Sequence, residues 1–233
     1  GLAVPAPVMQ TLMTEEMLQE NYRLDCVVTL ADAVNGLEQL ETMEEPVKQA
    51  ALADRIVITK SDLAGEEVTA RLEARLRELN PQAPIRRALN GEIELAFLID
   101  VGLRNVKGKL EDIERWMGEP DEHGHRHSHD SKVKSFSLRY TEPLSWQLFS
   151  QTMEVLGALR GSDMLRVKGL VNVAGHKGPM VIQGVQHLFH PPVELEAWPS
   201  ADHSTRIVFI TRNIPRETVA NLFAAIGAVT AAA

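Results

Sequence analysis

The sequence predicts an α/β protein that is built from two different parts. In the first part, short apolar runs rich in β-branched residues alternate with helical segments, which predicts βαβ units and a parallel sheet. The second part has the order β-α-β-β-β-α, typical of a small α+β domain with helices on one face of an antiparallel sheet. Residues 119–131 lie between them and contain no aliphatic residue, so they cannot form a core. We therefore divide the chain into 1–118, a linker over 119–132, and 133–233.

Helices and strands are both expected in the first part. Its two clearest strands are apolar throughout, so both of their faces need cover. Two or three parallel strands are too few for a stable doubly wound sheet. Either another chain or segment completes this sheet, or the chain lacks its beginning. In order, we predict a helix over 7–20, a strand over 24–31, a helix that closes at 49–53, a strand over 55–59, a helix over 66–79, a short strand over 84–87, and helices over 92–99 and 110–117.

The second part is expected to form an antiparallel sheet with two helices. Residues 134–140 alternate between apolar and polar side chains, as in a half-buried strand, and residues 144–159 have helical periodicity. Three strands over 165–174, 179–188 and 206–211 follow, and a last helix covers 216–226.

Composition and charge exclude several classes of protein. The chain has 233 residues, 44% of them hydrophobic, which is enough to bury a substantial core. No apolar run reaches the roughly 20 residues of a membrane-spanning helix, and the first residues do not resemble a signal peptide. The single cysteine, Cys26, excludes a disulfide framework and a cysteine-only zinc site. We expect a cytoplasmic protein without a membrane partner.

The net charge of −8 is unevenly distributed along the sequence. Residues 1–118 carry −8, residues 119–131 carry −3 and residues 132–233 carry +3. A surplus of +3 is small for a nucleic-acid-binding domain, which normally presents a clustered basic face. We therefore expect no nucleic-acid partner.

The clearest functional motif is Thr59-Lys60-Ser61-Asp62, here called the TKSD motif, directly after the second apolar strand. Ligands of α/β folds bind at the carboxyl ends of parallel strands. A carboxylate there can accept two hydrogen bonds from the N1 and N2 edge of guanine, whereas adenine offers no such pair of donors. The stem of a lysine can lie over the plane of a base. By themselves these residues leave two interpretations open, a guanine site and an ordinary strand-to-helix turn.

A nucleotide site also needs groups that hold the phosphates. The sequence contains no G-x-x-x-x-G-K-[ST] loop. Residues 102–109 come nearest, but their glycine spacing is wrong, and Leu110 has no hydroxyl group for magnesium. We interpret this segment as a loop before a helix.

Several further motifs follow one another in a fixed order. They are GLA and PAPV within residues 1–8, YRLD, VVT and DA within 22–33, QAALAD at 49–54, LNP and API within 79–85, MLRVKGL at 164–170, QGV at 183–185 and RIVFITR at 206–212. In this order, with a TKSD motif that is a variant of [NT]KxD, they resemble the CobW-type GTPases. These are P-loop metallochaperones that include proteins of cobalamin synthesis and zinc allocation. The resemblance runs essentially from end to end.

The resemblance implies roles for particular residues. It makes Thr59, Lys60 and Asp62 part of the guanine site, and it makes Gly1 the residue whose backbone N–H senses the γ-phosphate. Asp32 ends a strand near the expected site, and we interpret it as a turn or helix N-cap residue. No catalytic residue is assigned within the chain.

The resemblance also implies an incomplete P-loop GTPase domain over 1–118, followed by a CobW-type C-terminal domain over 133–233. Val4 stands where the family usually has Asp. The family's phosphate loop, magnesium ligand and C-x-C-C metal motif belong upstream of Gly1. We therefore expect the chain to be a C-terminal fragment of such a GTPase that does not hydrolyse GTP by itself, so whether the chain alone is an enzyme stays open.

A second candidate site is formed by histidines of the linker. His123, His125, His127 and His129 are four of the eight histidines of the chain. Alternate side chains of an extended segment share a face, and neutral imidazole is a good ligand for zinc, copper, nickel or cobalt. We expect weak, exchangeable binding of Zn²⁺ or Co²⁺, with poor selectivity because nothing rigid fixes a tetrahedral site. The alternative is a solvated linker that is merely rich in histidine.

Taken with the resemblance, these features imply a GTP-dependent metallochaperone. GTP with Mg²⁺ would bind and be hydrolysed by the parent protein, coupled to the delivery of zinc or cobalt, with cobalamin synthesis as one setting. The expected partners are guanine nucleotide, a client metalloprotein or metal-insertion enzyme, and a second copy of the chain in a homo-oligomer. The alternative is a non-enzymatic module that binds metal and docks a partner through its C-terminal sheet.

Overall fold

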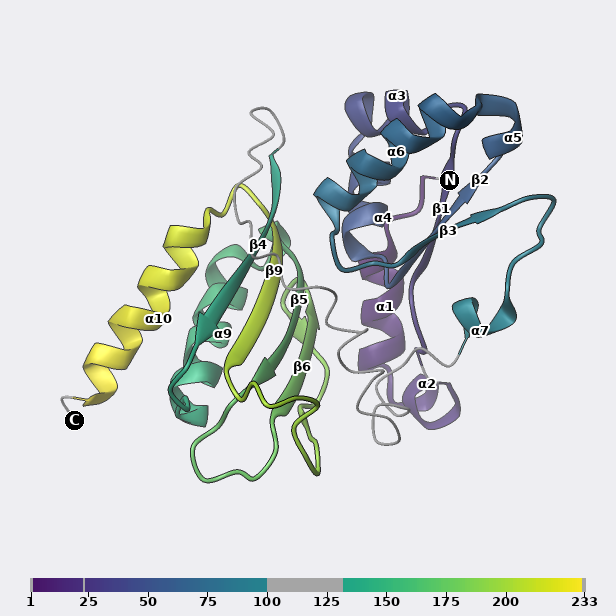
Figure 1. Cartoon of the computed structure of the whole chain (residues 1–233). Coiled ribbons are helices and arrows are strands. Elements are labelled where there is room, and N and C mark those ends of the chain that lie inside the picture. Colours follow the sequence, from purple (N-terminus) through teal and green to yellow (C-terminus); the bar gives the residue numbers. More distant parts are fainter. Residues whose placement is uncertain (1, 23, 100–131, 232–233) are drawn as a thin grey trace. The chain divides into compact units, whose positions relative to one another are not determined.

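The computed structural model describes residues 2–22, 24–99 and 132–231 (Figure 1). The contacts divide the chain into two compact units, Gly1–Glu119 and Pro120–Ala233. The first unit contains a parallel sheet and the second an antiparallel sheet, which confirms the predicted fold class. None of the helices in the described ranges is both long enough and apolar enough to cross a bilayer. The expected helix over 110–117 lies outside the described residues.

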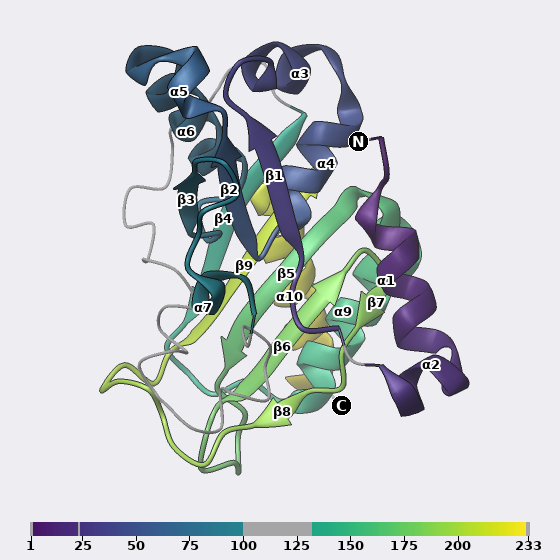
Figure 2. The same cartoon turned by 90° about the vertical axis from the view of Figure 1, so that its right-hand side faces the viewer.

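The first unit is built around three parallel strands in the order β1-β2-β3, which Figure 2 shows side by side. The central strand β2 is the most deeply buried, because Ile56, Val57 and Ile58 are all shielded from solvent. The elements are α1 (Pro5–Thr14), α2 (Glu16–Asn21), β1 (Val28–Asp32), α3 (Gly36–Thr42), α4 (Glu44–Leu52), β2 (Arg55–Thr59), α5 (Ser61–Ala64), α6 (Glu66–Leu79), β3 (Ile85–Ala88) and α7 (Leu95–Leu98).

The single helix predicted over residues 7–20 is wrong, because the structure has two helices there. The backbone between α1 and α2 becomes extended at Glu15, with φ −80° and ψ 114°. Thr11 and Thr14 donate their side-chain hydroxyls to backbone carbonyls four residues earlier, a contact that tends to bend helices.

Two further boundaries also differ from the prediction. β1 begins at Val28 instead of residue 24, because the backbone N–H of Val27 donates to the carboxylate of Asp54. The helix predicted over 92–99 is reduced to α7, because the backbone N–H of Glu92 donates back to the carbonyl of Leu89 and the backbone of Glu94 is extended, with φ −61° and ψ 123°.

The second unit is an antiparallel sheet in the order β4-β9-β5-β6-β7, with β8 paired to β6. The strand predicted over 179–188 ends early, at Val185, because Gln186 takes a φ of 55° and the chain turns into β7. The short strands β7 and β8 were not predicted. The elements are β4 (Val133–Tyr140), α9 (Trp146–Arg160), the 3-10 turn η2 (Gly161–Asp163), β5 (Met164–Val171), β6 (Met180–Val185), β7 (Leu188–Phe189), β8 (Val193–Glu194), β9 (Thr205–Arg212) and α10 (Arg216–Ala231).

Both helices of the second unit cover the same face of its sheet (Figures 1 and 2). Phe149 and Met153 of α9 and Phe223 of α10 belong to one buried cluster with Phe209 and Ile207 of β9. This arrangement confirms the predicted placement of helices on one face. The second unit therefore has a hydrophobic core of its own.

Asn80 fixes the start of β2 in the first unit. Its side chain is buried, and its amide nitrogen donates to the carbonyls of Ala50, Ala51 and Ala53 at 2.9, 3.3 and 2.9 Å. Its amide oxygen accepts from the backbone N–H of Ala83 at 3.2 Å. One side chain thus ties the end of α6 to the end of α4, immediately before β2 begins.

We expect Asn80→Ala to destabilise the first unit by about 3 kcal/mol, because it leaves buried backbone groups without partners. Native-state hydrogen exchange of the β2 amides measures this loss. Asn21→Ala is the matched control, because Asn21 is exposed and its side chain donates one bond, to the Met17 carbonyl at 2.8 Å. Equal exchange rates in the two variants would show that Asn80 has no such role.

Candidate functional site

The parallel pairing of β1 and β2 brings two chain segments to one edge of the sheet. Asp32, the last residue of β1, is the register partner of Thr59, the last residue of β2. The backbone N–H of Ala33 donates to the carbonyl of Thr59 at 2.9 Å. The hydroxyl of Thr59 lies 3.5 Å from the carbonyl of Ala31. The TKSD motif therefore begins at the carboxyl edge of the sheet, where ligands of such folds bind.

Lys60 makes a sharp turn between β2 and α5. Its backbone is left-handed, with φ 58° and ψ 28°, a conformation that costs about 1 kcal/mol for a residue other than glycine. Its carbonyl accepts hydrogen bonds from the backbone N–H groups of Leu63 and Ala64 at 3.1 and 3.2 Å. The turn is thus held by the first turn of α5 and by the end of β1.

Asp32 is a turn residue, as predicted, and it also forms an ion pair that was not predicted. Its Oδ1 accepts from the backbone N–H groups of Val34 and Asn35 at 2.8 and 3.4 Å. Its Oδ2 accepts from the side-chain amide of Asn35 at 3.3 Å and from Lys60 Nζ at 2.6 Å. Burial raises the pKa of the Asp32 carboxyl, but the hydrogen bonds from Lys60, Val34 and Asn35 outweigh burial and hold this pKa below its usual value.

Asp62 lies on α5, and its side chain is exposed. Within the described ranges, no side chain or backbone group bonds to its carboxylate. Thr59 and Lys60 are therefore brought together with Asp32, while Asp62 presents a carboxylate to solvent two residues further along the chain. The predicted phosphate sensor Gly1 lies outside the described residues.

The metal site predicted in the linker also lies outside the described residues, since His123, His125, His127 and His129 all fall within 100–131. Elsewhere, over the parts of the chain that the structure describes, no group of three or more His, Cys, Asp and Glu side chains is placed to hold a metal ion. His176 and Glu194 form a pair 3.0 Å apart at the surface of the second unit.

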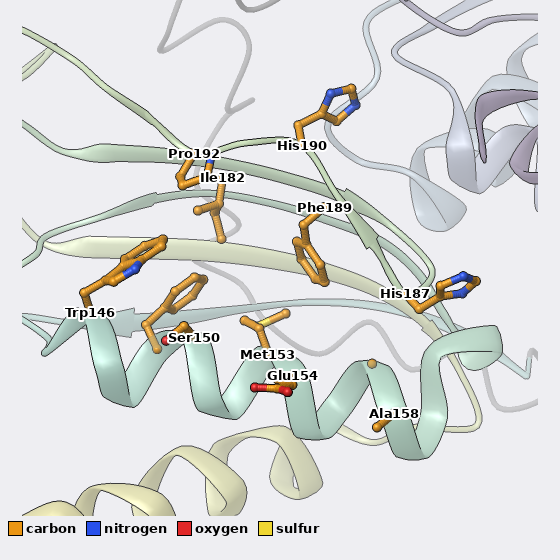
Figure 3. A pocket seen from close by; sticks show the side chains of 12 residues that line it. Trp146, Ser150, Met153, Glu154, Ala158, Ile182, His187, Phe189, His190 and Pro192 are labelled. Atoms are coloured by element: carbon orange, nitrogen blue, oxygen red, sulfur yellow. The ribbon is translucent and has the colours of Figure 1, made fainter. Parts of the chain in front are cut away.

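The second unit also contains an apolar groove of about 550 Å³ between α9 and the segment from β6 to Pro192 (Figure 3). Met153 of α9 and Phe189 of β7 point toward one another across it. Its volume is in the range of small-ligand pockets. No sequence pattern indicated this groove, since it is assembled from a helix and strands that are distant in the chain. Its apolar lining includes Trp146, Phe149, Met153, Ile182, Phe189 and Pro192.

Comparison with known families matches both parts of the chain. Residues 1–87 match the CobW/HypB/UreG nucleotide-binding domain. Residues 133–227 match the C-terminal domain of the cobalamin synthesis protein cobW. The first match includes the TKSD motif and Asp32, and the second covers the antiparallel sheet.

Curated relatives are similar over nearly the whole chain. The chain is 31% identical to the zinc chaperone YjiA of Escherichia coli (strain K12), over 96% of this chain and 68% of that protein. It is 24% identical to the zinc-regulated GTPase metalloprotein activator 1 of Saccharomyces cerevisiae, over 95% of this chain and 59% of that protein. It is 27% identical to the zinc chaperone CobW of Pseudomonas aeruginosa, over 95% of this chain and 63% of that protein. The chain thus spans 59–68% of the length of these relatives.

A solved structure has the same fold. The crystal structure of the Zn(II)-bound YjiA GTPase from E. coli matches with a TM-score of 0.79 and 29% sequence identity, over 97% of this chain and 68% of that one. Two family domains in the expected order, a relative at 31% identity and this structural match lead to one conclusion: the chain belongs to the CobW family of GTPases and metallochaperones.

Proposed function

We propose that this protein acts as a GTP-dependent metallochaperone, and that its TKSD motif binds the guanine base. The observation that carries the proposal is the placement of this motif at the carboxyl edge of the parallel sheet, directly after the buried strand β2. The printed names of the relatives, which include zinc chaperones and a GTPase, support the activity.

Guanine recognition follows from the chemistry of the motif. The exposed carboxylate of Asp62 can accept hydrogen bonds from guanine N1–H and from the N2 amino group. Adenine has neither donor at these positions, so it would gain neither of these bonds. The stem of Lys60 can cover the plane of the base, and Thr59 is the last residue of β2 directly before it.

The described residues supply the base end of a nucleotide site. In a complex with GTP, Mg²⁺ neutralises charge on the phosphates. The sequence has no G-x-x-x-x-G-K-[ST] motif to hold them, and the γ-phosphate contact of Gly1 is a proposal that rests on the family resemblance. We therefore propose base selection, rather than cleavage of the phosphate bond, as the task of the residues of this chain.

Zinc is the cargo that we propose, because two of the relatives are named zinc chaperones. Cobalt stays the second candidate, since imidazole binds either metal. We propose the linker histidines His123, His125, His127 and His129 as weak, exchangeable ligands. The receiver would be a client metalloprotein or metal-insertion enzyme in the cytoplasm, and a second copy of the chain is a further candidate partner.

We expect Asp62→Ala to remove the preference of the chain for GMP over AMP, with a loss of at least about tenfold in GMP affinity. Asp62→Asn should favour XMP, because an amide can donate to the C2 carbonyl of xanthine. Titrations followed by NMR measure each affinity, and Glu67→Ala, an exposed acid on α6, is the control. A preference for GMP that survives Asp62→Ala would refute the guanine site.

We expect the variant with alanine at 123, 125, 127 and 129 to bind fewer zinc ions per chain, because it lacks the weak site that we propose in the linker. The zinc affinity of the intact chain should fall as the solution becomes acidic, because protonated imidazole cannot bind zinc. Calorimetric titration with zinc and with cobalt measures the stoichiometry. The matched control replaces His176 and His187 of the second unit. If the linker variant binds as many ions as the intact chain, the histidine site does not exist.

A further inference from the structure

The ion pair between Asp32 and Lys60 joins the ends of two parallel strands. Lys60 Nζ lies 2.6 Å from Asp32 Oδ2, and the side chain of Lys60 is 52% exposed while that of Asp32 is 22% exposed. A pair this accessible to water stabilises the fold only slightly. Its importance therefore lies in where it holds the lysine side chain, and less in the strength of the contact.

Asp32 is a rigid anchor for this contact. Its carboxylate accepts four hydrogen bonds, two from backbone N–H groups, one from the Asn35 amide and one from Lys60. The two backbone bonds close a tight turn after β1, so the carboxylate cannot rotate freely. Its position is set before any ligand arrives.

The backbone of Lys60, from which the side chain begins, is fixed as well. Before Lys60, the backbone N–H of Ala33 donates to the carbonyl of Thr59, and after it the Lys60 carbonyl accepts hydrogen bonds from α5. These contacts maintain the left-handed backbone at φ 58°. Because the backbone end is fixed and Asp32 attracts the ammonium end, the aliphatic stem of Lys60 has fewer conformations to lose on binding a ligand than the stem of an unpaired lysine.

We propose that Asp32 is a positioning residue of the guanine site, which holds the stem of Lys60 in place as one wall of the base pocket. This inference rests on the proposed function, since the pocket is that of the TKSD motif. A base that stacks on an ordered stem does not need to immobilise it, so Asp32 strengthens binding without touching the base. Base selection stays with Asp62, whose exposed carboxylate lies outside the ion pair.

The alternative is that Asp32 serves only the turn after β1. Asp32→Asn separates the two roles, because the amide oxygen still accepts from Val34 and Asn35 while the charge that attracts Lys60 is gone. In the intact chain, we expect Asp32→Asn to weaken GMP binding about fivefold while the preference for GMP over AMP remains. The control Glu44→Gln breaks a matched ion pair with Lys48, at 2.9 Å on α4, and should leave GMP binding unchanged.

A double-mutant cycle tests whether Asp32 acts through Lys60. Lys60→Met keeps an unbranched stem but removes the charge, so Asp32→Asn should have no further effect on GMP binding in this background. NMR relaxation of the Lys60 side chain in the nucleotide-free protein gives an independent measure. We expect an ordered stem in the natural sequence and a mobile one in Asp32→Asn.

Four results would overturn the inference. One is an Asp32→Asn effect of the same size with Lys60 and with Met at position 60, because Asp32 would then act through the turn alone. Another is a Lys60 stem that is equally mobile with and without the Asp32 charge. The third is a natural chain that binds GMP no better than AMP, which would remove the proposed function together with the pocket wall. If Asp62→Ala abolishes the GMP preference and Asp32→Asn changes nothing, only the positioning role is wrong.

Discussion

The register between β1 and β2 is the constraint on which the candidate site depends. Successive side chains of a strand point to opposite faces, so a slip by one residue would turn Asp32 away from its present face. Its partner Thr59 would then lie opposite an alanine, and the ion pair to Lys60 would be lost. The register is fixed by the buried middle of β2 and by Asn80, which holds the chain just before that strand. The hydrophobic core of the first unit thus sets the positions of Asp32 and Lys60, although neither residue is part of that core.

Elements whose signals are local were predicted at their observed bounds. β2 (Arg55–Thr59) and α6 (Glu66–Leu79) are such cases, because an apolar run defines the first and a leucine stripe followed by Asn80-Pro81 defines the second. The start of β1 was placed too early, because it is set by the side chain of Asp54, distant in sequence from Val27. A sequence pattern carries no information on a bond of this kind until the fold is known.

In the candidate site too, the local motif could be predicted from the sequence and the long-range contact could not. The TKSD motif is contiguous, so its position after a buried strand was visible in the sequence. The contact between Asp32 and Lys60 joins residues separated by 28 positions, and it requires a left-handed backbone at a lysine, which sequence rules assign mainly to glycine and asparagine. The strand-ending position of Asp32 was the available signal, and it was interpreted as that of a turn or helix N-cap residue. Asp32 has two roles, since its Oδ1 accepts from a backbone N–H of the turn and its Oδ2 accepts from Lys60 Nζ.

The two units bury separate cores, and this separation bears on how a chaperone of this family can work. The cluster around Phe209 and Phe149 draws only on residues of the second unit, while Asp32, Lys60 and Asp62 belong to the first. If nucleotide binding controls the release of metal to a client, the coupling free energy must come from differential contacts that change with nucleotide state, because a ligand that interacts equally with two states shifts neither. The proposed base site suits this division, since it would supply affinity and selectivity for guanine and would leave the switching to the phosphate end of the nucleotide.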